Sequence, residues 1–140
     1  MNALCQSART REHALCQPTG FGAFSLACEF QPIVSPTHRR TVGFESLARP
    51  WHNGAPVSPG ALFAEANAGG QEPLLDLALW QQALYTYAQI KPNAWLFLNL
   101  SAASVGDACT TPDTLAQLVH HSGLSCDRIV LEIVEDAVHD

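Results

Sequence analysis

The sequence predicts an α/β protein whose strands lie parallel, either in a barrel or in an open sheet. Strand-type and helix-type segments follow one another in the order β, β, α, α, β, α, β, which contains two crossovers of the β–helix–β kind. The segment 94–100 is apolar on both of its faces up to one asparagine, as a parallel strand covered on both sides should be. No glycine-rich loop follows a strand, which disfavours a Rossmann nucleotide site.

The first two predicted strands follow a lead segment. Residues 1 to about 24 have no clear periodicity, and the turn residues Pro-Thr-Gly-Phe-Gly at 18–22 interrupt the chain. A strand is predicted over 28–34, where a proline should weaken pairing on one side, and a second over 41–47. The chain is therefore divided into a poorly defined lead segment, 1–25, and a domain, 26–140.

Three helices and two further strands are predicted after these. A helix over 58–69 opens with Ser-Pro, an N-cap followed by a first-turn proline, and ends at two glycines. Apolar residues recur at helical spacing over 74–91, which predicts a helix with one face against a sheet. Thr-Pro opens a third helix over 111–119, which Ser-Gly stops. Apolar strands at 94–100 and 129–133 follow the second and third helices.

Composition excludes several classes of protein. The chain of 140 residues carries a formal net charge of −6, which argues against a general DNA-binding surface. Its five cysteines are an odd number without a C-x-x-C pair, so neither a disulfide framework nor a closed zinc site is indicated, and a reducing cytoplasm is expected. No segment has the length of a signal peptide core or of a membrane span.

Three strands each carry one oxygen-bearing side chain at or near the C-terminal end. These are Glu45, Asn99 and Glu132, and the C-terminal ends of parallel strands meet at one edge of a sheet. Two carboxylates and an amide make an oxygen-rich site for a hard divalent cation. Taken singly, a glutamate at a strand end is more often a solvated rim residue, whereas an asparagine inside an apolar strand needs hydrogen-bond partners or a metal.

Five motifs resemble the first half of an EAL domain in order and spacing. They are Gln31-Pro-Ile-Val, Gly43-Phe-Glu-Ser-Leu-Ala-Arg, Val57-Ser-Pro, Leu98-Asn-Leu-Ser-Ala and Leu131-Glu-Ile-Val-Glu. The resemblance implies an incomplete (β/α)8 TIM-type barrel with about the first four strands and their helices. It also implies the family's activity, the metal-dependent hydrolysis of the bacterial signalling dinucleotide cyclic-di-GMP to the linear dinucleotide.

The same resemblance assigns roles to individual residues. Glu45, Asn99 and Glu132 match metal ligands in a site for two Mg²⁺ or Mn²⁺ ions, and Glu135 matches a glutamate that supports a loop near the metals. Two cations would activate a water and stabilise the charge that builds on the phosphoryl group during in-line attack.

Positions that contact the dinucleotide in the family are matched by Gln31, Leu47 and Arg49. A guanidinium facing phosphate oxygens is chemically apt, although Arg49 considered alone is more often a surface cation. The chain departs from the family pattern just after this arginine, where Pro50 stands in place of a frequent aromatic residue and Trp51 follows one position later.

A complete barrel takes about 250 residues, so the chain is expected to be a truncated domain. The family's paired aspartates, a lysine and later ligands would lie beyond residue 140, and the isolated piece is expected to be inactive. A half-barrel would leave open strand edges that favour self-association. The alternative function is a non-catalytic, degenerate EAL module that binds cyclic-di-GMP or a protein partner in bacterial signalling.

Overall fold

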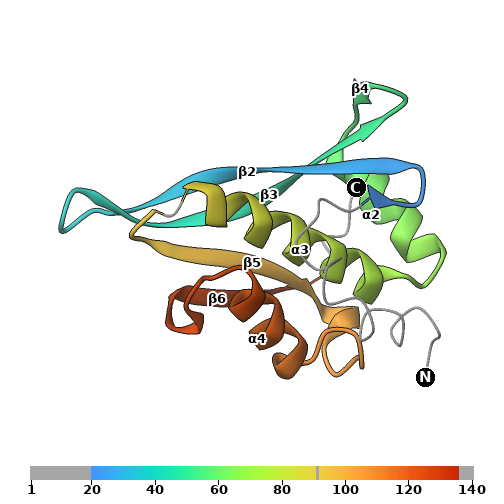
Figure 1. Cartoon of the computed structure of the whole chain (residues 1–140). Coiled ribbons are helices and arrows are strands. Elements are labelled where there is room, and N and C mark those ends of the chain that lie inside the picture. The colour runs from blue at the N-terminus through green and yellow to red at the C-terminus, as the bar shows by residue number, and fades with distance from the viewer. Residues whose placement is uncertain (1–19, 91, 136–140) are drawn as a thin grey trace.

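The structure is a computed structural model, and it describes residues 20–90 and 92–135 (Figure 1). Most of the predicted lead segment, residues 1–19, therefore lies outside the described residues. The strands are β1 (Gly20–Phe21), β2 (Phe24–Ser35), β3 (Arg40–His52), β4 (Ala55–Pro56), β5 (Trp95–Ser101) and β6 (Ile129–Val134). The helices are α2 (Pro59–Ala68), α3 (Glu72–Ile90) and α4 (Pro112–His121), with short 3-10 turns η1 (Ala102–Ser104) and η2 (Cys126–Arg128).

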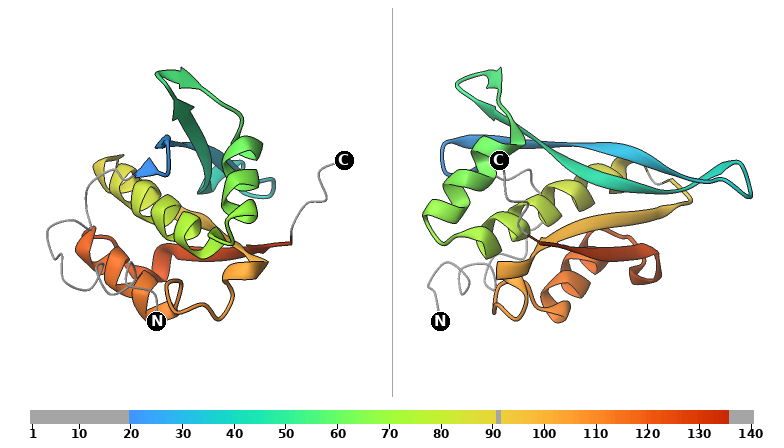
Figure 2. Two further views of the ribbon diagram at one scale, coloured as in Figure 1. Left: turned by 90° about the vertical axis from the view of Figure 1, so that its right-hand side faces the viewer. Right: turned by 180° about the vertical axis from the view of Figure 1, so that it is seen from behind.

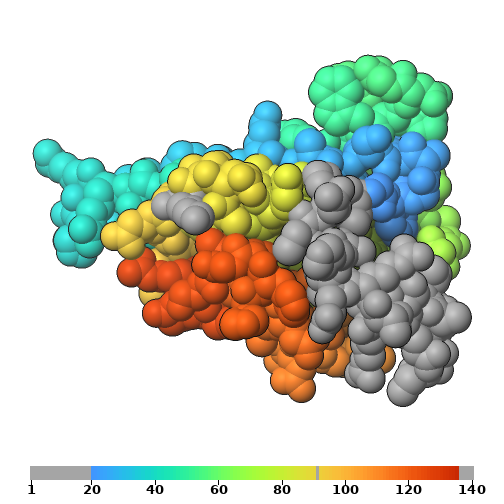
Figure 3. Space-filling model, viewed as in Figure 1, coloured from blue at the N-terminus to red at the C-terminus, as the bar shows by residue number. Residues whose placement is uncertain are grey.

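One sheet holds all the described strands, in the order β1-β2-β3-β5-β6, with β4 added to the far end of β3. β2 and β3 form a long antiparallel hairpin, whereas β3, β5 and β6 run parallel and are connected through helices. The β2–β3 hairpin and the β3–β4 hairpin both project beyond the body of the molecule (Figure 3). This is the sheet of an incomplete TIM-type barrel, as the resemblance implies, but the antiparallel pairing of β1, β2 and β4 differs from the expected parallel arrangement.

Helix starts follow the predicted capping chemistry. The Ser58 side chain accepts a hydrogen bond from the backbone N–H of Ala61 at the start of α2, and the Thr111 side chain accepts one from Thr114 at the start of α4. A proline occupies the first turn of each of these helices, where its missing N–H is not needed. The sequence signals therefore locate both helices correctly to within a few residues.

Helices α3 and α4 lie on the same side of the sheet (Figure 2). The main core forms there, where Leu96, Leu98 and Leu100 of β5 pack against Trp80 and Leu84 of α3 and their neighbours on α4. A second core cluster joins β1 and β2 to α2 and the first half of α3. Burial of these apolar side chains stabilises the fold by roughly 25 cal/mol for each Å² removed from water.

The exposure of the other face of β5 differs from the prediction. The strand was expected to be buried on both sides, but Trp95 is 47% exposed, and Phe97 and Asn99 are half-buried. The helices cover only the leucine face, so the second apolar face is open in the described part of the chain. An exposed apolar face of this kind is the inside of a barrel whose covering strands are not among the described residues.

Two strand boundaries also differ from the prediction. β3 continues to His52 because β2 and β4 pair with its far half, so Glu45 lies in the middle of the strand and at the end only of its parallel contact with β5. β2 begins at Phe24, before the predicted strand start at residue 28, and Phe21 of β1 and Phe24 of β2 are buried in the second core cluster. The division of the chain at residue 25 into two domains stays a prediction.

Candidate functional site

Strand register places the predicted metal ligands on one face of the sheet. Glu45 pairs with Phe97 in the parallel ladder of β3 and β5, and Asn99 pairs with Glu132 in the ladder of β5 and β6. Paired residues point to the same side of a sheet, as do residues two apart along a strand. Glu45, Asn99 and Glu132 therefore all point away from α3 and α4, with Asn99 on the central strand of the three.

Glu45 and Asn99 are in direct contact. The amide nitrogen Nδ2 of Asn99 donates a hydrogen bond to Oε1 of Glu45 over 3.2 Å. This bond fixes the orientation of the carboxamide and leaves its oxygen as the atom that can coordinate a cation. Glu132 lies beside Asn99 on the neighbouring strand and is exposed. The backbones of neighbouring strands are roughly 4.8 Å apart. Glu135 follows the end of β6 and is also exposed.

Gly43 allows β3 and β5 to approach each other just before this contact. A Cβ atom on Gly43 would lie 2.7 Å from Cε2 of Phe97 and 3.0 Å from the backbone oxygen of Trp95. The first distance is shorter than real Cβ contacts and the second is among the tightest, so a larger residue here would require the Phe97 ring to move and the backbone at Trp95 to shift by a few tenths of an ångström. The close approach brings the Glu45 carboxylate within reach of Asn99.

Beyond Glu45, β3 and β5 separate. A cavity of about 610 Å³ opens there, at the C-terminal ends of the parallel pairing and against α2 and α3. Its walls include Glu45, Asn99, Ser101, Asp76 and Glu135. Glu132 does not line this cavity, so of the predicted ligands only Glu45 and Asn99 face it. The apolar part of the wall comes mainly from α2, α3 and β5. It includes Phe63, Leu75, Leu79, Trp80 and Leu98.

Two side chains of α3 hold the end of β5. Trp80 donates its indole N–H to the backbone oxygen of Asn99 over 3.0 Å. One turn earlier, Oδ2 of Asp76 accepts hydrogen bonds from the backbone N–H of Ser101 at 2.8 Å and from the hydroxyls of Ser101 at 2.7 Å and Ser104 at 2.6 Å. Asp76 is only 3% exposed, so these bonds are made out of contact with water.

Sequence reasoning missed Asp76. The available signal was an acid inside the apolar helical run of 74–91, four residues before Trp80 and therefore on the buried stripe. A buried carboxylate must be compensated by donors or a charge, and here three donors from the turn after β5 provide the compensation. The backbone from the carbonyl of Asn99 to the N–H of Ser101 is thus anchored to α3.

The predicted dinucleotide contacts lie on the same open face. Gln31 pairs with Glu45 across the β2–β3 ladder, and Leu47 and Arg49 follow at alternate positions of β3. Nε of Arg49 donates to Oε2 of Glu29 over 2.8 Å, and Nη1 donates to the backbone oxygen of Ala48 over 2.9 Å. The guanidinium is therefore oriented, but the Glu29 carboxylate would compete with any anion that approaches it.

One thiol beside the cavity is unreactive in its environment. Burial raises the pKa of Cys28, an effect that hydrogen bonds to Thr86 and Ser46 only partly offset. The thiol therefore stays protonated near neutral pH, which makes it a weak nucleophile and a weak metal ligand. Oxygen atoms are thus the donors available at this site.

The chemistry of the donor set fits a hard divalent cation. Carboxylate and amide oxygens are the ligands that Mg²⁺ and Mn²⁺ prefer. Within residues 20–90 and 92–135, no three His, Cys, Asp or Glu side chains are grouped so that they could hold a metal ion. Glu45 and Asn99 are thus in contact at the cavity, and Glu132 lies on the same face of the sheet but outside the cavity lining.

A family model described as EAL domain matches residues 19–140 of the chain. No curated protein sequence matches it significantly. In the part of the chain that the structure describes, none of the helices combines the length and the apolar character that crossing a membrane requires.

Several solved structures share the fold. A standalone EAL protein of Vibrio cholerae O395, in its c-di-GMP-bound form, is 24% identical with a TM-score of 0.68, over 86% of this chain and 49% of that chain. The EAL domain of FimX from Pseudomonas aeruginosa, bound to c-di-GMP, is 20% identical with a TM-score of 0.62, over 94% and 50%. BlrP1 of Klebsiella pneumoniae, in a manganese and cy-diGMP complex, is 25% identical with a TM-score of 0.53, over 84% and 28%. The chain thus spans about half the length of the first two.

Proposed function

Because this chain belongs to the EAL domain family, we propose that it forms the first part of a metal-dependent site for the hydrolysis of cyclic-di-GMP. The observation that carries the proposal is the arrangement of Glu45, Asn99 and Glu132 on one open face of three parallel strands, with the first two in hydrogen-bond contact. Hard cations prefer oxygen ligands, and the three adjacent strands supply three such donors.

In this proposal Glu45 and Glu132 bind Mg²⁺ or Mn²⁺ through their carboxylates, and Asn99 binds through its amide oxygen. When bound, two such ions supply a water of lowered pKa and stabilise the charge that develops on the phosphoryl group. Asn99 adds a donor without adding negative charge beside an anionic substrate. Glu135, at the edge of the cavity, steadies a loop near the metal ions in this proposal.

The dinucleotide is held along β3 and β2. Arg49 offers its remaining N–H groups to a phosphate, while Glu29 keeps the guanidinium aligned with the open face. Gln31 and Leu47 contact the ligand on either side of Glu45. We place this activity in the cytoplasm on the basis of the cysteine usage in the sequence, and in bacteria on the basis of the family resemblance.

The chain by itself is proposed not to turn over its substrate. Mg²⁺ demands near-octahedral coordination, and three donors fill only part of the coordination sphere of even one ion. The lysine and the paired aspartates of the family have no counterparts among the described residues on this face. Self-association through the open strand edges stays a prediction.

Binding of Mn²⁺ to the 140-residue chain tests the ligand assignment. Titration followed by the electron paramagnetic resonance of free Mn²⁺ should show that Glu45→Gln weakens binding at least tenfold, because a carboxylate ligand loses its charge. Glu72→Gln is the matched control, since Glu72 lines the same cavity and loses the same charge. Equal affinities in the two variants would remove Glu45 from the metal site.

Incubation with cyclic-di-GMP separates the two candidate functions. No linear dinucleotide should accumulate with the chain alone, and rapid hydrolysis would show that the donors present are sufficient. Tight binding of cyclic-di-GMP without any Mn²⁺ binding would favour the non-catalytic module instead.

A further inference from the structure

Trp51 continues the line of proposed ligand contacts along β3. Glu45, Leu47, Arg49 and Trp51 stand at alternate positions, and their pairing with β2 runs without a register shift from Gln31 to Ser25. Side chains at alternate positions of one strand share a face. The Trp51 side chain is 42% exposed, so a large aromatic surface stands on the open face at the end of this line.

Pro50 determines which way Trp51 points. Pro50 is among the fully buried side chains, and it pairs with Leu26, which belongs to the second core cluster. Because Pro50 occupies the helix-facing position, the next residue must face the opposite side. An aromatic residue at position 50 would be directed into the core, whereas the aromatic residue at position 51 is directed onto the face of Glu45 and Arg49.

The backbone of Trp51 is held on both sides. It pairs with Ser25 of β2 on one side and with Pro56 of β4 on the other. The β3–β4 turn consists of Asn53 and Gly54, with φ of 50° and 76°, which are the values that a two-residue hairpin turn requires. Trp51 thus stands on a paired strand and not on a loose loop.

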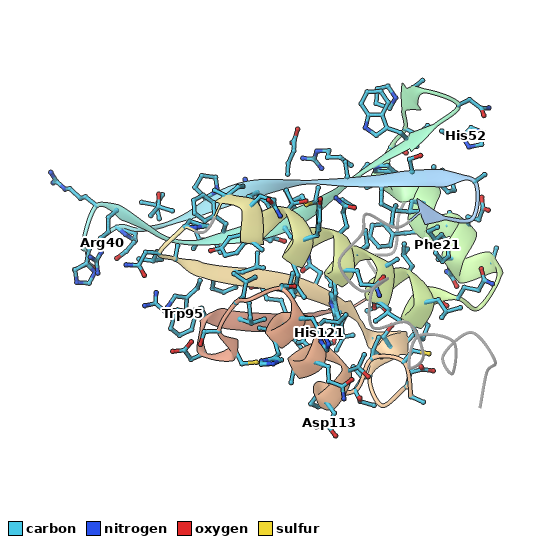
Figure 4. The ribbon with its side chains drawn as sticks, viewed as in Figure 1. Phe21, Arg40, His52, Trp95, Asp113 and His121 are labelled. Carbon is cyan, nitrogen blue, oxygen red and sulfur yellow. The ribbon has the colours of Figure 1, made fainter. Side chains whose placement is uncertain are left out.

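A second contact anchors the same hairpin from behind. The His52 ring, whose position is marked in Figure 4, packs on Phe24 at a centroid distance of 5.6 Å and an interplanar angle of 53°. Phe24 is itself buried in the second core cluster. The hairpin is therefore attached to the core through one face, while the indole of Trp51 is left on the other. A rigid aromatic group loses little conformational entropy when a ligand stacks on it.

Spacing and chemistry then identify the ligand group. Neighbouring alternate positions of a strand are roughly 7 Å apart, so Trp51 stands about that far beyond Arg49 and roughly 20 Å from Glu45. In a nucleotide, the base is separated from its phosphate by one sugar, a distance of the same order as the spacing between Arg49 and Trp51. A guanidinium suits the phosphate, and a flat indole suits the base.

We infer that Trp51 is a stacking platform for one guanine base of cyclic-di-GMP, with Arg49 on the adjacent phosphate. This inference rests on the proposed function, because it extends the same face of the sheet by one ligand contact. Stacking of a base on an aromatic side chain typically changes affinity by about tenfold.

The test is titration of cyclic-di-GMP into the 140-residue chain with Mn²⁺ present, measured by calorimetry. Trp51→Ala should weaken binding about tenfold, and Trp51→Phe should recover most of the affinity because it retains an aromatic face. Trp95→Ala is the matched control, because Trp95 is 47% exposed on the same face but at the opposite end of the sheet. The affinity of Trp95→Ala for cyclic-di-GMP should equal that of the unchanged chain. Far-ultraviolet circular dichroism checks that each variant is folded.

Fluorescence gives an independent readout. Binding should quench the emission of the unchanged chain and of Trp95→Phe, but much less that of Trp51→Phe. Equal affinities for Trp51→Ala, Trp95→Ala and the unchanged chain would overturn the stacking role while leaving the proposed function standing. Absence of cyclic-di-GMP binding in the unchanged chain would overturn both.

Discussion

Asp76 offers the sharpest test of how this site is held together. Its carboxylate is 3% exposed and accepts three hydrogen bonds from the turn after β5. In Asp76→Ala the backbone N–H of Ser101 loses a charged acceptor and cannot turn to another. The hydroxyls of Ser101 and Ser104 lose less, because they already share a hydrogen bond of 2.6 Å with each other.

The expected cost follows from these contacts. A hydrogen bond to a charged group contributes about 1.5–3 kcal/mol, and a buried donor left without a partner costs about 1–3 kcal/mol. We expect Asp76→Ala to lower the free energy of unfolding by about 3 kcal/mol. Asp76→Asn retains an acceptor oxygen but not the charge, so it should lower that free energy by about half as much.

Urea denaturation monitored by circular dichroism measures both variants. Glu72→Gln, one turn earlier on α3, is the control and should stay within about 0.5 kcal/mol of the unchanged chain. A double-mutant cycle with Ser101→Ala should return a coupling energy above about 0.5 kcal/mol. A loss below 1 kcal/mol in Asp76→Ala would refute the view that this carboxylate anchors the strand end.

Two further predictions concern strand approach and pH. Gly43→Ala should lower the free energy of unfolding by about 1–3 kcal/mol in urea denaturation and shift the amide resonances of Asn99, because the Phe97 ring and the Trp95 backbone must both move to admit the new Cβ atom; unchanged stability would contradict this. Burial raises the pKa of the Cys28 thiol in the folded chain above its value in the unfolded chain. The contribution of the protonated thiol to stability is therefore complete below the ordinary thiol pKa of about 8.5, and it is lost as the pH rises through the folded pKa. Cys28→Ala should therefore show a shallower loss of stability at alkaline pH, and identical slopes would exclude Cys28 as a source. A residual slope is expected from Tyr87, whose pKa burial also raises.

Much of the fold could be predicted from interactions between residues close in sequence. Ser58 and Thr111 are followed by prolines, and both cap helices in the structure as these signals require. Apolar periodicity predicts a helix over 74–91 and a strand over 94–100, and the structure has them at 72–90 and 95–101. These features depend on neighbours close in sequence, so the sequence specifies them without knowledge of the rest of the molecule.

Strand ends were harder to predict. The extension of β3 to His52 depends on pairing with β2 and β4, which involves residues far along the chain or after a turn. The burial of β5 on one face only depends on which elements cover it, and that is a property of the packed molecule. Periodicity within a segment contains neither piece of information.

For the candidate site, the sequence by itself determined that Glu45, Asn99 and Glu132 follow one another on three strands, because residue type and alternation along a strand are local properties. Only the tertiary structure decided that Asn99 donates to Glu45, that Asp76 anchors the turn beyond it, and that Trp51 shares the open face. The physical reason is that hydrogen bonds and ladder register join residues distant in sequence, and their partners are selected when the sheet and α3 pack together.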